Sequence, residues 1–301
     1  MGNIITPDKY YKSALSEGWA VGGFIGYNME IMQASAWAAQ DVDAPIMLQA
    51  SCRVVDYAGA GMLRKMAEAL AEQMERQVIL HLDHGDTVER CLHCIDHGFS
   101  SVMLDNEFDS FEKNVEKTRI VCDYAHAHGA VVEGEVFHPI DSPDKYWTDV
   151  DEAVEYVRLT ACDSLAFCCG NAHDLPEDYP RKLHVEQIAA IHKALPDMPL
   201  VLHGTSILSP EFVARVNRLG GALNQPYNFS LEDIQESFRH GVCKVNSALD
   251  IKLVYTSAVR EYMMDAPHQF DPRKYLGHAR DAAREYIAWK HKNVFMDDGK
   301  Y

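Results

Sequence analysis

Short apolar segments alternate with longer amphipathic segments along most of this chain. The apolar segments are candidate strands and span residues 20–27, 45–50, 78–82, 101–104, 131–136, 164–167, 200–202 and 242–245. Segments with helical periodicity lie between them, among them residues 61–76, 87–97, 110–128, 150–161, 184–194, 210–219 and 231–240. Continuous apolar strands separated by helices are typical of a parallel sheet that is covered on both faces. Eight such strands favour a (β/α)8 TIM barrel over an open doubly wound sheet.

The strand pattern ends near residue 247, and the rest of the chain has a helical pattern. One helix is expected from Leu249, and Pro272 opens a last helix that runs to Lys290. No linker rich in Pro, Gly or Ser divides the chain. We therefore expect residues 1–301 to form a single barrel domain with extra C-terminal helices.

Polar side chains cluster where six consecutive strands end. Because the C-terminal ends of barrel strands meet at one face, and that face carries the active site in this fold, we expect these side chains to share one site. They are Asp83 and His84 after the third strand, Asp105 after the fourth, Glu133 and Glu135 on the fifth, Asn171 and His173 after the sixth, His203 to Ser206 after the seventh, and Lys244 to Ser247 on the eighth.

Three of these residues are histidines. A lone histidine at a strand end is more often a hydrogen-bonded structural residue than a ligand, but His84, His173 and His203 together predict a metal site. Zinc accepts three imidazoles and leaves a position for substrate. A neighbouring carboxylate, Asp83, is a candidate acid/base. These parts fit aldol cleavage or isomerisation of a ketose through a metal-stabilised enediolate, and they also fit zinc-hydroxide hydrolysis. His81 shares the strand face of Asp83 and is expected behind the site or in the core.

Composition narrows the class of protein. The formal net charge of −17 argues against nucleic acid as a partner, since phosphates require clustered Lys and Arg. The chain has neither an 18-residue apolar run nor the pattern of a signal peptide, so we expect a soluble cytoplasmic protein with no membrane partner.

The eight scattered cysteines are expected to be reduced and packed. Cys91 and Cys94 have CxxC spacing without a second pair, which favours a structural role.

Two loops are long enough to be either a mobile lid or a surface loop. Residues 137–147 follow the fifth strand and contain His138, whose role stays open. Residues 219–229 follow the helix after the seventh strand. Long loops on the active-site face of a barrel often close over the substrate.

These motifs resemble those of the class II, zinc-dependent ketose-bisphosphate aldolases, of the fructose- and tagatose-bisphosphate type. The similarity runs through nearly the whole chain. It rests on HLDHG (81–85), GFSSVMLD (98–105), VEGE (132–135), DSLAF with GNAH (163–173), LVLHG (200–204), GVCKVN (241–246) and DPRKYLGHAR (271–280). The resemblance implies that His84, His173 and His203 bind zinc and that Asp83 transfers the proton.

The resemblance implies further roles. Asp105 and Glu135 match acidic residues near the metal that serve a second metal, a monovalent cation or the surroundings of the zinc. Asn246 matches a catalytic-site residue that contacts the donor half of the sugar. Arg273 matches an arginine that reaches a neighbouring subunit's site and holds the distal phosphate, so the resemblance also implies a homodimer or homotetramer.

Departures from the family pattern gather where the donor phosphate is held. A glycine after the second zinc histidine is Asp174 here, the last glycine of the third motif is Ile207, and a threonine is Leu249. Gly204 and Ser206 are retained for substrate binding. Losing two glycines removes close backbone approach to a phosphate, and an added carboxylate repels a dianion. We therefore expect zinc-dependent aldol chemistry with an altered donor end. The alternative is that residues 219–229 rebuild the phosphate site.

The loop after the fifth strand lacks the glutamate that the family uses as a second acid/base. Asp141 and Asp144 are candidate replacements. Two other functions remain open besides a lyase: a zinc-dependent sugar isomerase or epimerase, which uses the same enediolate, and a catalytically silent homologue.

Overall fold

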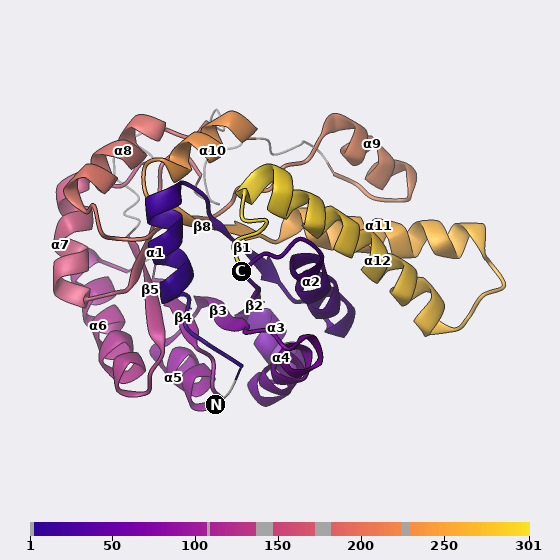
Figure 1. The fold of residues 1–301 in the computed structure, drawn as a ribbon, viewed down its shortest axis with the longest axis horizontal. Coiled ribbons are helices and arrows are strands. Elements are labelled where there is room, and N and C mark those ends of the chain that lie inside the picture. Colours follow the sequence, from indigo (N-terminus) through magenta and orange to yellow (C-terminus); the bar gives the residue numbers. More distant parts are fainter. Residues whose placement is uncertain (1–2, 107–108, 137–146, 172–181, 224–228) are drawn as a thin grey trace.

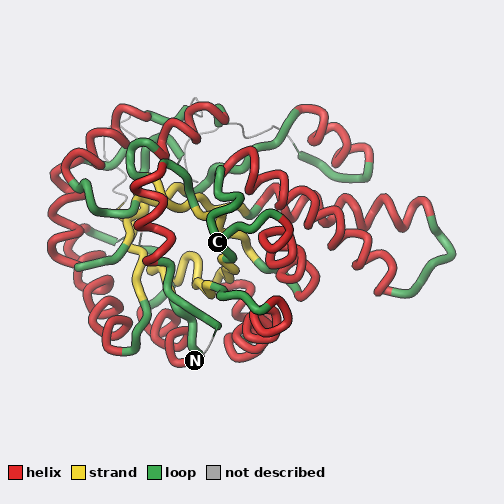
Figure 2. Tube along the Cα trace, in the orientation of Figure 1, coloured by secondary structure: helices red, strands yellow, loops and turns green. Residues whose placement is uncertain are grey.

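The computed structural model describes residues 3–106, 109–136, 147–171, 182–223 and 229–301. Within these ranges, eight parallel strands pair in chain order and the last pairs with the first, so the sheet is a closed barrel (Figures 1 and 2). This confirms the predicted (β/α)8 fold. The strands are β1 (Val21–Ile25), β2 (Met47–Ser51), β3 (Ile79–Gly85), β4 (Ser101–Leu104), β5 (Val131–Val136), β6 (Ser164–Phe167), β7 (Leu200–Leu202) and β8 (Val242–Ser247).

The helices cover the outside of the barrel, as Figure 2 shows in red. The predicted helical segments agree with them to within two residues at each end, while α1 to α3 were not among those segments. The helices are α1 (Asp8–Glu17), α2 (Met29–Asp41), α3 (Cys52–Ala58), α4 (Ala60–Met74), α5 (Val88–Asp96), α6 (Phe111–Ala127), α7 (Val150–Thr160), α8 (Val185–Ala194), α9 (Pro210–Arg218), α10 (Leu231–Phe238), α11 (Leu249–Asp265) and α12 (Pro272–Lys290), followed by the π-helix η1 (His291–Phe295).

Two strands run two or three residues further than the sequence pattern predicts. β3 continues through Asp83 and His84 to Gly85, because Asp83 pairs with Ser51 of β2 and Gly85 pairs with Leu104 of β4. β8 continues to Ser247, which pairs with β1. Polar residues at a strand end break the apolar run but not the ladder, since the ladder is formed by backbone groups. The predicted ends at residues 82 and 245 were therefore too early.

The N-terminal end of the barrel is closed by apolar side chains. Tyr10, Tyr11 and Ala14 of α1 pack with Trp19 and with residues from the first halves of β1, β2, β3 and β8. Apolar packing of this kind excludes water from the end of the barrel where it occurs. The opposite end, where polar residues end β3 and β8 and follow β7, is the one that can admit a ligand.

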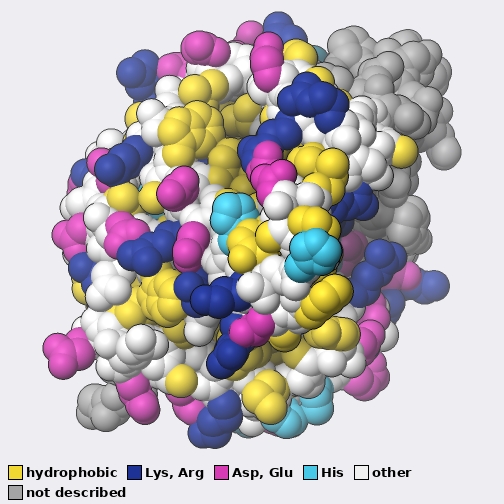
Figure 3. All heavy atoms as spheres, turned by 90° about the vertical axis from the view of Figure 1, so that its right-hand side faces the viewer, with side chains coloured by type: hydrophobic (Ala, Val, Ile, Leu, Met, Phe, Trp, Pro, Cys, Tyr) yellow, Lys and Arg dark blue, Asp and Glu magenta, His cyan; other side chains and the backbone are white. Residues whose placement is uncertain are grey.

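The C-terminal helices form an arm. α11 and α12 lie side by side and extend away from the barrel in Figure 1, and α12 also packs against α2. Met263, Met264 and Phe270 are exposed near the far end of this arm. Figure 3 views the molecule from the arm's side and shows acidic, basic and hydrophobic side chains intermixed. Among the helices described, none combines the length and the apolar composition needed to cross a membrane.

Candidate metal and catalytic site

A cavity of about 370 Å³ opens at the C-terminal ends of the strands. Residues that the sequence analysis singled out for chemistry line it together with apolar side chains from β1 and the start of α11. The lining residues are Ile25, Tyr27, Ser51, Asp83, His84, Asn171, His203, Gly204, Thr205, Ser206, Asn246, Ala248 and Leu249.

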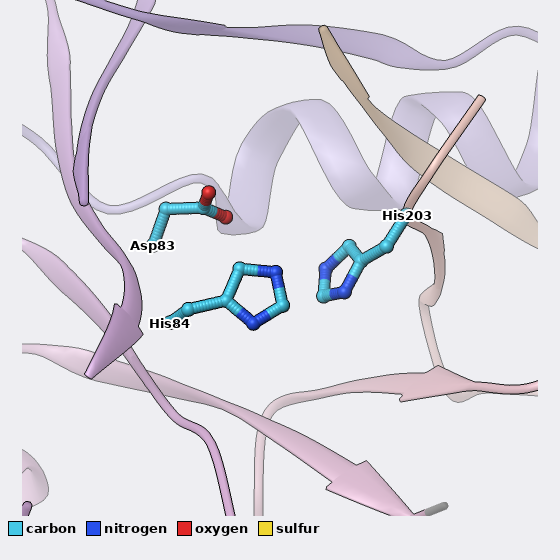
Figure 4. Close-up of side chains that lie close together, drawn as sticks. All are labelled: Asp83, His84 and His203. Atoms are coloured by element: carbon cyan, nitrogen blue, oxygen red, sulfur yellow. The ribbon is translucent and has the colours of Figure 1, made fainter. Parts of the chain in front are cut away.

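The rings of His84 and His203 lie side by side in this cavity although 119 residues separate them in the chain. Their centroids are 4.7 Å apart, and Figure 4 shows the two rings facing each other with the Asp83 carboxylate beside them. One potential ligand atom from each of Asp83, His84 and His203 lies within 4.8 Å of the others. β3 supplies the first two residues and the segment after β7 supplies the third.

An irregular backbone places the His84 ring. His84 has a φ of 53°, a left-handed conformation that is uncommon for a residue with a side chain, and the β3–β4 register shifts between Leu82 and Gly85. Two contacts hold this bend: the Cys52 thiol donates to the His84 carbonyl over 3.0 Å, and the Asp105 N–H donates to the Gly85 carbonyl over 2.9 Å. The bend turns both Asp83 and His84 toward the cavity instead of to opposite faces of the strand.

Glu133 and Asn171 fix the position of His203. Its Nε2 lies 2.8 Å from Oε1 of Glu133, and the other oxygen of that carboxylate lies 2.6 Å from the ammonium of Lys244. Asn171 Nδ2 donates to the His203 carbonyl over 3.0 Å. The remaining ring nitrogen, Nδ1, is buried and has no hydrogen-bond partner among the described residues; Glu135 Oε1 is 3.4 Å from it. A buried nitrogen without a partner is expensive unless something else occupies its lone pair.

The Asp83 carboxylate is fixed by one hydrogen bond. Asn246 Nδ2 on β8 donates to Asp83 Oδ1 over 2.7 Å. Only 6% of Asp83 is exposed, and that part faces the cavity. The amide therefore leaves Oδ2 as the oxygen best placed to exchange a proton with a molecule in the cavity.

A second group of potential ligands shares His84. His84 Nδ1 lies 2.7 Å from Asp105 Oδ2, and atoms of His84, Asp105 and Glu135 lie within 4.8 Å of one another. With Asp83, and with Glu133 behind His203, this makes four carboxylates around two imidazoles. Such a concentration of negative charge favours a bound cation.

The shifted pKa values of these residues also favour a bound cation. Burial by itself lowers the pKa of His84, but the charge of Asp83 and the hydrogen bond that Asp105 accepts from the ring outweigh it and raise the pKa to about 10. The pKa of His203 is also raised, because its hydrogen bond to Glu133 and the nearby Glu135 carboxylate outweigh burial. The pKa of Asp83 is lowered, since the charge of His84 opposes the effect of burial. Without a metal, these carboxylates draw protons onto the imidazoles, and a bound cation would take the place of those protons.

The donor set fits zinc. Imidazole nitrogen and carboxylate oxygen are zinc ligands, and an open position in the coordination sphere is typical of catalytic sites. His203 Nδ1 and Glu135 Oε2 are both buried and have no hydrogen bond within the described ranges, so they are the atoms that a cation would satisfy.

Several predicted residues fall outside the described ranges. They are His173, the third predicted zinc ligand, Asp174 at the donor end, and His138, Asp141 and Asp144 in the loop after β5.

Of the remaining predicted residues, Gly204 and Ser206 line the cavity. Arg273 does not: its side chain is 88% exposed at the start of α12 and pairs with Asp271. Cys91 and Cys94 are buried on α5, and all eight cysteines are free thiols.

The sequence pattern placed Glu133 and Lys244 among the polar residues at the strand ends but predicted no role for them. Both side chains are fully buried inside the barrel. A charged residue in the middle of an otherwise apolar strand was the available signal, because an isolated buried charge is too costly to persist without a partner.

Comparison with known proteins agrees with this geometry. The family described as fructose-bisphosphate aldolase class-II matches residues 6–300. The chain belongs to this class II aldolase family. It is 35% identical to the fructose-bisphosphate aldolase of Treponema pallidum (strain Nichols), over 100% of this chain and 98% of that protein. It is 36% identical to the fructose-bisphosphate aldolase of Thermus caldophilus, over 94% and 95% of the two chains.

Solved structures agree on the fold. The YdjI aldolase of Escherichia coli K12 matches this class II aldolase with a TM-score of 0.79 and 26% identity, covering 99% of both chains. The fructose-bisphosphate aldolase of Campylobacter jejuni matches with a TM-score of 0.80 over 97% of this chain and 96% of its own, at 21% identity. The chain is therefore a lyase of the aldolase class, which confirms the predicted enzyme class.

Proposed function

We propose that this class II aldolase is zinc-dependent and reversibly cleaves a ketose or ketose phosphate. The observation that carries the proposal is the convergence of His84, His203 and Asp83 at the open end of the barrel. His84 and His203 bind the metal together with His173, and Asp105 and Glu135 bind a second cation or orient the first. Zinc supplies, when bound, an electrophile that stabilises negative charge developing on the donor oxygens.

The chain's own residues then handle the proton and the orientation of the sugar. Asp83 exchanges a proton with the substrate at Oδ2, while Asn246 holds Oδ1 and keeps the carboxylate aimed into the cavity. Gly204 and Ser206 bind the donor half of the sugar from the loop after β7. General acid–base catalysis by a positioned carboxylate contributes roughly 10²- to 10⁴-fold in rate.

The donor end of the substrate differs from a sugar phosphate in this proposal. Leu249 and Ala248 place apolar atoms in the cavity wall, and the described part of that wall contains no Lys or Arg. Ile207 stands beside Ser206 where a glycine would leave the backbone open to a phosphate. A donor that ends in a hydroxyl fits such a wall better than one that ends in a dianion.

The far end of the substrate is anionic in this proposal. A groove next to the cavity is lined by Arg53 and Lys252, together with Tyr57, His84 and Asp105. Neither cation has a carboxylate partner among the described residues. Two unpaired cations favour a phosphate or carboxylate on the distal half of the sugar, and Arg273 of a neighbouring subunit would add a third.

Steady-state kinetics with three ketoses tests the proposal. We expect fructose 6-phosphate, which keeps only the distal phosphate, to be cleaved with a kcat/KM at least equal to that of fructose 1,6-bisphosphate and above that of fructose 1-phosphate. A strong preference for the bisphosphate would refute the altered donor end but not the aldolase. The variant Leu249→Thr restores the family's residue and should raise kcat/KM for the bisphosphate selectively.

Product analysis separates the aldolase from an enzyme that only rearranges the sugar. A lyase yields two smaller carbonyl compounds, whereas an isomerase or epimerase yields one isomer of the same mass. Stoichiometric zinc with no turnover of any ketose would favour a silent homologue.

A further inference from the structure

Lys244 lies inside the barrel, where charged side chains are rare. Its side chain is fully buried, and its ammonium lies 2.6 Å from Glu133 Oε2 and 3.1 Å from His81 Nε2. His81 Nδ1 in turn lies 2.7 Å from Ser101 Oγ. The lysine therefore crosses the barrel from β8 to β3 and β5, and each of its contacts is itself fixed on a strand.

The free energy of unfolding does not by itself explain why Lys244 and Glu133 are buried as a pair. The cost of removing two charges from water offsets most of their attraction, and apolar residues of similar size are often equally stable. The role of the buried Lys244–Glu133 pair therefore depends on the other groups that the two side chains contact.

Glu133 uses its two oxygens in different directions. Oε2 faces Lys244, and Oε1 lies 2.8 Å from His203 Nε2. A carboxylate can only accept in a hydrogen bond, so Nε2 of His203 carries the hydrogen. The lone pair of the ring is then on Nδ1, a buried nitrogen with no hydrogen bond in the described part of the chain, whose nearest recorded neighbour is Glu135 Oε1 at 3.4 Å.

We propose that Lys244 is a positioning residue that acts through Glu133 to aim Nδ1 of His203 at the metal. With Oε2 held by the lysine, the carboxylate cannot rotate, and the imidazole bonded to Oε1 keeps one tautomer and one ring orientation. This inference rests on the proposed metal site and adds to it a group that touches neither metal nor substrate.

A second buried lysine provides a matched control. Lys290 lies 2.5 Å from Asp250 Oδ2 and 2.7 Å from Ser247 Oγ, and its side chain is also almost completely buried. This pair joins α12 to the start of α11 and has no contact with His84 or His203. It reproduces the burial and chemistry of the Lys244–Glu133 pair without the link to a histidine.

The test compares zinc affinity in two charge-neutral double variants. Glu133→Gln/Lys244→Met and Asp250→Asn/Lys290→Met each remove one buried pair without leaving an unpaired charge. The metal-free proteins are titrated with zinc in competition with a chromogenic chelator. We expect the first variant to bind zinc roughly 10- to 100-fold more weakly than the wild type and the second to bind within about twofold of it.

The single variant Lys244→Met assigns the effect to the lysine. A similar loss of zinc affinity, with a changed absorption spectrum of the cobalt-substituted protein, supports positioning. Wild-type zinc affinity in a folded Lys244→Met protein would refute the positioning role of Lys244. If that variant does not fold, wild-type zinc affinity in the Glu133→Gln/Lys244→Met protein would refute it. A wild-type protein that binds no zinc would instead refute the proposed metal site.

Discussion

Asn246 Nδ2 donates a 2.7 Å hydrogen bond to Asp83 Oδ1, which links β8 to β3 across the mouth of the barrel. The two residues are 163 positions apart in the chain, and the barrel brings them together because β8 closes onto β1. The amide fixes the carboxylate next to the two histidines and leaves one oxygen for proton transfer.

The variant Asp83→Asn should lose catalysis but keep the metal. An amide of the same shape still accepts a hydrogen bond but cannot take up a proton, so we expect kcat to fall roughly 10²- to 10⁴-fold. Zinc content after dialysis should stay at the wild-type level. The comparison variant Asn246→Ala removes the hydrogen bond to Asp83, and with it the contact to Gln49, but keeps the carboxylate and should cost less. A kcat for Asp83→Asn near that of the wild type would exclude Asp83 as the acid/base.

Removing the metal should abolish activity and lower the thermal stability. A ligand that binds only the folded state stabilises it by about 2.7 kcal/mol when its concentration is 100 times its Kd. We expect the melting temperature to fall after treatment with a chelator and to recover, with activity, when zinc is added back. Magnesium serves as the control, because it prefers oxygen ligands and should restore little. Full activity in protein shown to be metal-free would contradict the proposed chemistry.

The variant Lys290→Met should unfold much more easily than the wild type. It leaves the Asp250 carboxylate buried without its cation, held only by hydrogen bonds from Ser247, Tyr286 and the Ile251 N–H. For this we expect a loss of about 3–5 kcal/mol in the free energy of unfolding. Urea denaturation followed by circular dichroism measures this loss. The double variant Asp250→Asn/Lys290→Met should recover most of it. If the single variant were as stable as the wild type, the pair would contribute nothing that an apolar contact does not.

His81 should make the metal-free protein less stable in acid. Burial and the nearby charge of Lys244 lower the pKa of His81 from 6.5 to about 3. The folded state therefore keeps the ring neutral between pH 6.5 and pH 3, whereas the unfolded chain takes up a proton there. Stability falls as the pH is lowered through this window, by about 1.4 kcal/mol per pH unit from this group.

Urea unfolding of the metal-free protein at pH 7 and pH 5.5 measures the effect of His81. The variant His81→Gln has no titrating ring, so its stability should fall less than that of the wild type between these two pH values, by about 1 kcal/mol. Equal pH dependence in the two proteins would show that His81 is protonated in the folded state.

The sequence by itself determined the barrel. Alternation of apolar and amphipathic segments specifies parallel strands and helices, because side-chain burial follows the local period of each element. It also predicted that His84, His203, Asp83 and Asn246 lie close together, since residues at the C-terminal ends of barrel strands converge wherever eight strands close into a ring.

Only the tertiary structure decided how these side chains are aimed. The left-handed backbone of His84 and the β3–β4 register shift have no signature in the local residue pattern, and they are held by Cys52 and Asp105 from other elements. The pairing of Lys244 with Glu133, and of Glu133 with His203, joins three strands that the local pattern treats separately. Hydrogen bonds between distant residues depend on their orientation in space, and a pattern along the chain records burial but not orientation.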